Sequence, residues 1–293
     1  MRFPGLPGLA AALAVLSAAG LLGAGAARAA CPTDEQIDGL VRDWKAGTPT
    51  RALAAGAGLQ DALCAQDGLV RRLRPGLGEV VGYKAGLTNK AVQQRFGVSE
   101  PVRGQLLAGM LLKDGAEVPA GFGARPLYEA DLLVIVADEG INQATTAEEA
   151  IRHVSAIRPF IELPDLALRE GEPMDGAVLT AINVGARAGV MGPEMPLAPT
   201  PEAVRDLAAM TVVVTDGTGA RLAEGKGEAV LGNPLNAVLW VARSLAAEGR
   251  RLKAGDMVSV GSFSPMMPPK AGQAVTVRYE GLPGTPQVSV RFR

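Results

Sequence analysis

The most constraining feature of the sequence is an apolar segment at 128–136 that carries two carboxylates, Glu129 and Asp131. The run of Leu, Val and Ile that follows them favours a β-strand inside the protein. Side chains two residues apart in a strand point to the same face, so we expect both carboxylates on one face. Neighbouring buried carboxylates repel each other and lose hydration, and a divalent cation removes both penalties.

A third carboxylate, Glu162, follows Pro159 in a short apolar segment that predicts a strand at 160–163. Ligation by oxygen alone suits Mg²⁺, Mn²⁺ or Ca²⁺ and does not suit zinc. The three carboxylates therefore predict a metal site. The spacing also allows a second interpretation, in which they lie at solvated strand ends.

Lys84 lies in a segment at 81–85 that is otherwise uncharged and mostly apolar, and Gly86 follows the segment. A lysine buried there has a lowered pKa and suits proton transfer. A surface lysine at a strand end is the alternative interpretation. His153, the only histidine, is expected to be a solvated or capping residue.

The pattern along the chain predicts one α+β domain over 30–293, mainly helical over 30–78 and richer in strands towards its end. The stretch 97–125 reads as loop, and Thr146 with Glu149 predicts a helix that runs to about Ile157, before Pro159. The other helices are expected at 34–45, 60–73, 88–96 and 236–247, and the other strands at 79–85, 210–215, 220–224, 257–262, 274–280 and 287–292.

Residues 1–29 have the pattern of a cleavable signal peptide, with Arg2 before an uncharged run and Ala27-Arg28-Ala29 as the cleavage site. A retained transmembrane anchor is the alternative. Cleavage predicts a periplasmic or secreted protein with no membrane segment. In such an oxidising compartment we expect a disulfide between Cys31 and Cys64, with two separate thiols as the alternative.

Composition excludes several classes of function. Lys and Arg total 29, Asp and Glu total 30, and aromatic residues make up 4%, so the chain lacks the basic surface and stacking platforms of a nucleic-acid binder. No GxGxxG, P-loop or GxSxG motif is present, which leaves nucleotide cofactors poorly supported.

Several segments in one order identify a resemblance that covers roughly residues 35–293. They are GYKAGLTNKAVQQRFGV at 82–98, YEADLLVIV at 128–136, RPFIELPDL at 158–166, GKGEAVLGNPLNAVLWVARSLAAEG at 225–249 and LKAGDMVSVGS at 252–262. This order resembles the hydratase/decarboxylase family of 2-oxopent-4-enoate hydratase and 4-oxalocrotonate decarboxylase, within the fumarylacetoacetate hydrolase superfamily.

The resemblance implies a mixed β-roll with flanking helices, a homo-oligomer, and a Mg²⁺ or Mn²⁺ site. The family's metal ligands match Glu129, Asp131 and Glu162, and its catalytic lysine matches Lys84. Asn183 matches a substrate-binding asparagine. The implied activity is a metal-dependent lyase on a small 2-oxo acid, most closely a 2-oxopent-4-enoate hydratase.

The chain also departs from the family pattern. Val102 and Ile182 stand where the family tends to carry acidic residues, and Leu127 stands where a basic residue is frequent. These changes, with the signal peptide, leave open an exported protein that binds oxo acids or metal with little or no catalysis. An acylpyruvate carbon–carbon hydrolase is a further alternative, although no histidine precedes His153 to serve an N-terminal lid.

Overall fold

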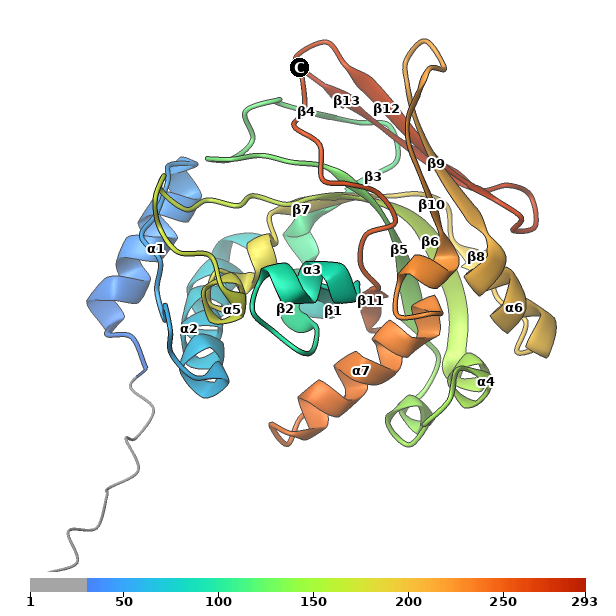
Figure 1. Cartoon of the computed structure of the whole chain (residues 1–293), viewed down its shortest axis with the longest axis horizontal. Helices are drawn as coiled ribbons and strands as arrows, with labels where there is room; N and C mark the ends of the chain where they lie inside the picture. The colour runs from blue at the N-terminus through green and yellow to red at the C-terminus, as the bar shows by residue number, and fades with distance from the viewer. Residues whose placement is uncertain (1–30) are drawn as a thin grey trace, which may run out of the picture.

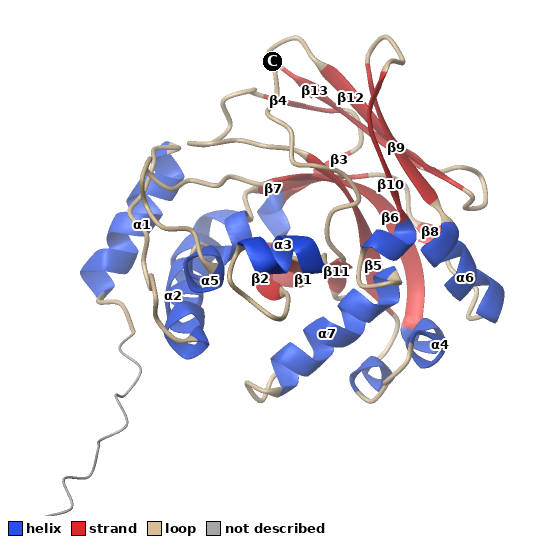
Figure 2. Ribbon diagram, viewed as in Figure 1, coloured by secondary structure: helices blue, strands red, loops and turns tan. Residues whose placement is uncertain are grey.

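The computed structural model describes residues 31–293 of the chain, so the expected signal peptide lies outside the described residues. Two β-sheets pack together and helices cover their flanks (Figures 1 and 2). The α+β class and the helical N-terminal part that the sequence predicts are confirmed.

The larger sheet of the described residues has the strand order β2-β1-β11-β5-β6-β7-β3, with β8 paired to β6. Its strands are β1 (Val80–Gly86), β2 (Val102–Leu107), β3 (Leu111–Lys113), β5 (Glu129–Val136), β6 (Val154–Leu163), β7 (Ala188–Met191), β8 (Met195–Pro196) and β11 (Met257–Ser259). The second sheet has the order β10-β9-β12-β13-β4. Its strands are β4 (Ala116–Val118), β9 (Thr211–Asp216), β10 (Arg221–Lys226), β12 (Ala274–Glu280) and β13 (Gln287–Phe292).

The helices gather in two groups around the sheets, with α1, α2 and α5 at one end and α4, α6 and α7 along the other flank (Figure 2). The α-helices are α1 (Asp34–Ala46), α2 (Leu59–Leu77), α3 (Lys90–Arg95), α4 (Ala147–Ala150), α5 (Gly176–Ala181), α6 (Pro201–Ala209) and α7 (Pro234–Ala246). Short 3₁₀ turns are η1 (Ala108–Met110), η2 (Glu139–Asn142), η3 (Ile151–His153), η4 (Asn183–Gly185) and η5 (Gly227–Ala229). In the part of the chain that the structure describes, no helix has the length and apolar character needed to cross a membrane.

The N-terminal helices show how local sequence sets their limits. Thr33 and Gln36 form a capping box that opens α1, and Gly47 ends it with a φ of 65°. The structure joins Cys31 to Cys64 by a disulfide, with Cα atoms 5.5 Å apart, and so attaches the start of α1 to α2. This is the pairing expected from the sequence.

The main core lies between the two sheets and α7, and it is built from alternate residues of the strands. Tyr279 of β12 is buried there, and its hydroxyl donates a hydrogen bond to the backbone carbonyl of Asp131 in β5. The second sheet thereby fixes the strand that carries two of the predicted metal ligands. A smaller core packs α1 and α2 against β2, α5 and η4.

Two sequence-based expectations are wrong. The stretch 97–125 contains β2, β3 and β4, and the helix expected from Thr146 ends after one turn because β6 already begins at Val154. Pro159 lies inside β6 and does not precede it. The carbonyl oxygen of Pro159 accepts a hydrogen bond from Gly192 N. The side of Pro159 that lacks an N–H therefore faces the gap between the part of β6 that pairs with β8 and the part that pairs with β7. No ladder hydrogen bond is lost in that gap, which is why the strand tolerates the proline.

Candidate functional site

The site is built on one face of the larger sheet. β5 and β6 pair antiparallel with Glu129 directly opposite Glu162, and Asp131 lies two residues further along β5. Cross-strand partners share a face, and so do residues two apart in one strand. All three predicted ligands therefore lie on the same face. Their surroundings exclude the interpretation of solvated strand ends, because Asp131 is 0% exposed, Glu162 is 2% exposed and Glu129 is half-buried.

Asp131 is held by the strand that separates β5 from β1. Its carboxylate accepts hydrogen bonds from the hydroxyl of Ser259 in β11, from Gly261 N at 3.0 Å and from Leu132 N at 2.5 Å. Complete burial raises the pKa of Asp131, and these donors oppose that shift. The donors also fix the orientation of the carboxylate.

Lys84 reaches the same face from β1 and is 3% exposed, so the interpretation of a surface lysine is wrong. Its Nζ atom donates to Oε1 of Glu162 and, at 2.9 Å, to the carbonyl oxygen of Val184. Burial lowers the pKa of Lys84 to about 8, while the negative charges of Glu129 and Asp131 oppose the shift. A buried amine that loses its proton near neutral pH suits general acid–base chemistry.

Glu129 completes the cluster. Burial raises its pKa to about 7; the ammonium of Lys84 opposes the shift and the carboxylate of Asp131 adds to it. With every group ionised, three carboxylates and one ammonium give −3 + 1 = −2 in a place with little water. The cluster is short of positive charge by the amount that one divalent cation supplies.

The arrangement of the side chains adds a condition to metal binding. Within residues 31–293, no three His, Cys, Asp or Glu side chains are placed so that they could hold a metal ion. Two of the predicted ligands already accept hydrogen bonds, because Lys84 donates to Glu162 and Ser259 donates to Asp131. The donor type, the burial and the charge of Glu129, Asp131 and Glu162 fit a hard divalent cation, provided that Lys84 withdraws from Glu162.

Asn183 lies in η4, above the face that carries Lys84. Its Oδ1 accepts from the backbone N–H of Gln105 at 2.7 Å, and its Nδ2 donates to the backbone carbonyl of Gln105 at 2.9 Å. A Cβ atom at Gly104 would lie 2.7 Å from the carbonyl oxygen of Asn183, so only glycine allows this close approach. The geometry gives Asn183 the role of a clamp between η4 and β2. Asn183 thereby fixes η4, in which the carbonyl oxygen of Val184 accepts a hydrogen bond from Lys84.

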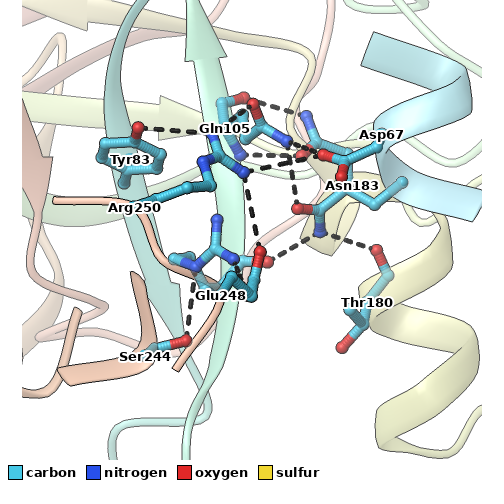
Figure 3. A network of polar contacts seen from close by, with 10 residues as sticks. Asp67, Tyr83, Gln105, Thr180, Asn183, Ser244, Glu248 and Arg250 are labelled. Atoms are coloured by element: carbon cyan, nitrogen blue, oxygen red, sulfur yellow. Dashed lines mark hydrogen bonds and ion pairs between the residues drawn. The ribbon is translucent and has the colours of Figure 1, made fainter. Parts of the chain in front are cut away.

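The opposite face of the β1–β2 ribbon carries a polar network that sequence reasoning missed (Figure 3). Arg103 is 2% exposed and pairs with Glu248, and Arg103 and Arg250 each lie 5.6 Å from the ring centre of Tyr83. Arg250 also contacts the side-chain oxygen of Gln105 at 3.2 Å. The network joins β1 and β2 to the end of α7. It therefore supports β1 on the face opposite to Lys84. These residues are far apart in the sequence, so no local pattern announces the network.

The residues that depart from the family pattern lie in apolar surroundings. Val102 at the start of β2 and Ile182 after α5 are both buried, in the cluster that also contains Val184. Glu100, two residues before Val102, is exposed, and Trp240 Nε1 lies 3.5 Å from its carboxylate. The carboxylate of Glu100 therefore faces α7 and does not replace the missing acid beside Lys84.

A cavity of about 800 Å³ lies beyond Val102, between the start of α2, the α3–β2 loop, α5 and α7. Its wall does not include Lys84 or the three carboxylates. Val102 belongs to the wall of the cavity and, through the β1–β2 register, to the face that carries Lys84.

Comparisons with known proteins identify relatives of the chain. No protein-family model matches the chain. A protein named TodF product hydratase from Pseudomonas putida is 31% identical over 242 residues, which are 82% of this chain and 88% of the relative. 2-Keto-4-pentenoate hydratase 2 from Dechloromonas aromatica is 34% identical over 207 residues, which are 69% of this chain and 75% of the relative.

Solved structures share the fold. 4-Oxalocrotonate decarboxylase from Pseudomonas putida G7, complexed with calcium and acetate, matches with a TM-score of 0.77 and 26% identity, over 89% of this chain and 99% of that one. The same decarboxylase complexed with magnesium and adipate matches with a TM-score of 0.76. Fumarylpyruvate hydrolase from Pseudomonas aeruginosa, in complex with Mn²⁺ and pyruvate, has a TM-score of 0.53, with 18% identity over 72% of this chain and 88% of that one, and shows the fold alone.

Proposed function

Because this chain belongs to the hydratase/decarboxylase family of 2-keto-4-pentenoate hydratase, we propose that it is a metal-dependent hydro-lyase acting on a small 2-oxo acid of the 2-oxopent-4-enoate type. The observation that carries the proposal is the buried cluster of Lys84, Glu129, Asp131 and Glu162 on one face of the sheet. Solved relatives hold a divalent metal, and for this chain we propose Mg²⁺ or Mn²⁺.

The proposed reaction adds water across the terminal double bond of 2-oxopent-4-enoate. The water oxygen bonds to carbon 4 and a hydrogen bonds to carbon 5, which gives 4-hydroxy-2-oxopentanoate with no oxidant or reductant. The reaction therefore needs a proton donor, a proton acceptor, and stabilisation of negative charge on the 2-oxo oxygen.

The residues of the cluster divide these tasks. Glu129, Asp131 and Glu162 would hold the divalent cation, which, when bound, supplies positive charge for the substrate carboxylate and 2-oxo oxygen. Lys84, with a pKa lowered to about 8, holds or releases a proton on the same face. Asn183 and the Arg103 network keep η4 and β1 in place, and the buried surroundings limit access of bulk water.

A second candidate rests on Val102 and Ile182. Both are apolar and buried, so the face beside Lys84 lacks the further acidic groups that the family pattern places there. A protein with this site binds 2-oxo acids through the cation but has Lys84 as the main proton carrier on this face. We therefore expect turnover of the five-carbon acid to be slow, and a binding protein with no turnover is the limiting case.

The test is an ultraviolet assay of purified 30–293 with Mg²⁺ or Mn²⁺ and a panel of unsaturated 2-oxo acids. Loss of the conjugated chromophore that depends on added metal, and that disappears in Lys84→Met, supports the hydro-lyase. Calorimetric binding of the acids without any loss of absorbance supports the binding protein. Absence of both turnover and binding would overturn the two candidates together.

We also propose that the chain is exported and works as a homo-oligomer in the periplasm or outside the cell. The Cys31–Cys64 disulfide supports export, because such bonds persist in oxidising compartments. N-terminal sequencing of protein from the periplasmic fraction should find a start near Ala30, and light scattering should give at least a dimer. A full-length chain in the cytoplasm would contradict export, and a monomer would contradict the assembly.

A further inference from the structure

Val102 connects the proposed catalytic face to the cavity. In the β1–β2 pairing, Lys84 lies opposite Gly104 and Gly86 lies opposite Val102, so Val102 shares a face with Lys84. A Cβ atom at Gly86 would lie 2.6 Å from Cγ1 of Val184 and 3.3 Å from Cγ2 of Val102. Val102 and Val184 belong to one apolar cluster, and the carbonyl oxygen of Val184 accepts a hydrogen bond from Lys84. Val102 is the member of this group that also lines the cavity.

The wall of the cavity is suited to an apolar group. Apolar side chains from α2, the α3–β2 loop, α5 and α7 contribute much of it, among them Leu59, Leu63, Val98, Ala177 and Trp240. Leu59, at the start of α2, is 58% exposed.

Most of the charged groups on the wall already have partners in the protein. Arg103 pairs with Glu248, and Asp175 accepts hydrogen bonds from Gly56 N and Val178 N. Glu100 has the N–H of Trp240 at 3.5 Å. The fifth charged residue of the wall, Arg243, is exposed. The favourable free energy of binding an apolar group here would come mainly from apolar area removed from water.

The size of the cavity exceeds the needs of a five-carbon acid. A volume of about 800 Å³ lies near the upper end of the roughly 300–1,000 Å³ range of small-molecule pockets. A pyruvyl group on the cation would occupy the carboxylate cluster and not this space, because the cluster is not part of the wall.

We infer that the cavity receives the distal end of the substrate, and that the preferred substrate is a 2-oxo-4-enoate with a bulky apolar group, such as an aromatic ring, on its terminal carbon. This inference rests on the proposed function, and it specifies the substrate class for the same site. The acid end lies at the carboxylate cluster, the double bond passes Lys84 and Val102, and the apolar group lies against α7 and α5.

Trp240 offers a direct measurement of occupancy. The chain has two tryptophans, and Trp44 packs against Arg187 in the N-terminal part. Trp44→Phe therefore leaves Trp240 as the only tryptophan of a protein whose fold can be checked by circular dichroism. With Mg²⁺ present, 4-phenyl-2-oxobutanoate should change the emission of Trp240 in a saturable way, and pyruvate should not. An equal effect of both acids, or no effect of either, would overturn the inference without any reference to turnover.

Filling the cavity gives the second measurement. Ala177→Phe places a ring on the α5 side of the wall, and Ala246→Phe places the same ring on an exposed position of α7 that does not line the cavity. In wild type, kcat/KM for 2-oxo-5-phenylpent-4-enoate should exceed that for 2-oxopent-4-enoate by roughly tenfold or more. Ala177→Phe should reverse most of this preference, and Ala246→Phe should leave it unchanged.

The outcomes separate the inference from the proposed function. If neither 2-oxopent-4-enoate nor its 5-phenyl derivative turns over, but 4-phenyl-2-oxobutanoate and not pyruvate alters Trp240 emission, the cavity assignment stands and the hydro-lyase fails. If both acids turn over at equal kcat/KM and Ala177→Phe changes their ratio by less than twofold, the hydro-lyase stands and the cavity assignment fails. Should Ala177→Phe not fold, the Trp240 titration decides alone.

Discussion

Lys84 donates a hydrogen bond from Nζ to Oε1 of Glu162, and both side chains are almost fully buried. The two residues come from β1 and β6, with β11 and β5 between them in the sheet. The pair partly neutralises the cluster, but it also uses an oxygen that a metal ion needs. A divalent cation held by Glu162 would therefore compete with Lys84 for this carboxylate, and the first two predictions test that competition.

Lys84→Met should abolish turnover and also destabilise the metal-free protein. It leaves Glu162 buried without its partner, and breaking one side of a buried pair costs about 3–5 kcal/mol. Urea unfolding with EDTA measures the loss, and added Mg²⁺ should restore a large part of it. Lys270→Met, at an exposed position, is the control. Equal stability of the two variants would contradict the buried pair.

Glu129→Gln should weaken the binding of Mg²⁺ or Mn²⁺ by roughly tenfold or more, because affinity for hard cations depends on the number of charged ligands. Calorimetry at constant pH measures the affinity. Glu148→Gln removes a carboxylate of the same type from the surface of α4 and should leave the affinity unchanged. If both variants bind metal as well as wild type, Glu129 is not a ligand.

Val102→Asp should raise kcat for the proposed hydration and lower the stability. The new carboxyl lies on the face of Lys84 and can carry a proton, a contribution of about 10²–10⁴-fold in favourable cases. It also enters the apolar cluster around Val184, which costs about 1–3 kcal/mol. Val102→Asn has nearly the same shape and cannot transfer a proton, so it should only destabilise. If kcat does not change in a folded Val102→Asp protein, the absence of an acid at this position does not explain slow turnover.

Asn183→Ala distinguishes a clamp from a substrate ligand. The change leaves the backbone N–H and carbonyl of Gln105 without partners, and each unsatisfied buried group costs about 1–3 kcal/mol. A clamp that acts through Val184 and Lys84 predicts a lower kcat with little change in KM. A substrate contact predicts a higher KM with the stability preserved. Steady-state kinetics and thermal unfolding together decide between them.

The disulfide should contribute about 3–4 kcal/mol to the free energy of unfolding, since it closes a long loop in the unfolded chain. The unfolded, unreduced protein should contain no titratable thiol. A double variant, Cys31→Ser with Cys64→Ser, should unfold at lower urea and lose all sensitivity to dithiothreitol. Two free thiols in untreated protein would contradict the bond.

Much of the site could be predicted from local sequence. Glu129 and Asp131 stand two apart in an apolar strand, and the period of a β-strand places them on one face whatever surrounds them. Lys84 was a candidate because it lies in a mostly apolar segment, but the sequence also allowed a surface lysine, and its burial is known only from the structure. Helix limits at Thr33 and Gly47 follow from capping chemistry that involves only neighbouring residues.

Other features depend on contacts between distant segments, and no local pattern contains them. The early start of β6 and the position of Pro159 follow from where β7 and β8 pair with it. The network around Arg103 joins residues from β1, β2 and the end of α7.

The sequence by itself determined the strand that carries the carboxylates and the family, because both depend on residue type and spacing. It named Lys84 and the two cysteines as candidates but left the burial of the lysine and the state of the thiols open. Only the tertiary structure decided that Lys84 binds Glu162, that Asn183 clamps Gln105, and that a cavity opens beyond Val102. The physical reason is that burial and side-chain contacts depend on how the whole sheet is arranged. In this sheet β11 and β5 separate β1 from β6, and the side chains of Lys84 and Glu162 still meet on one face.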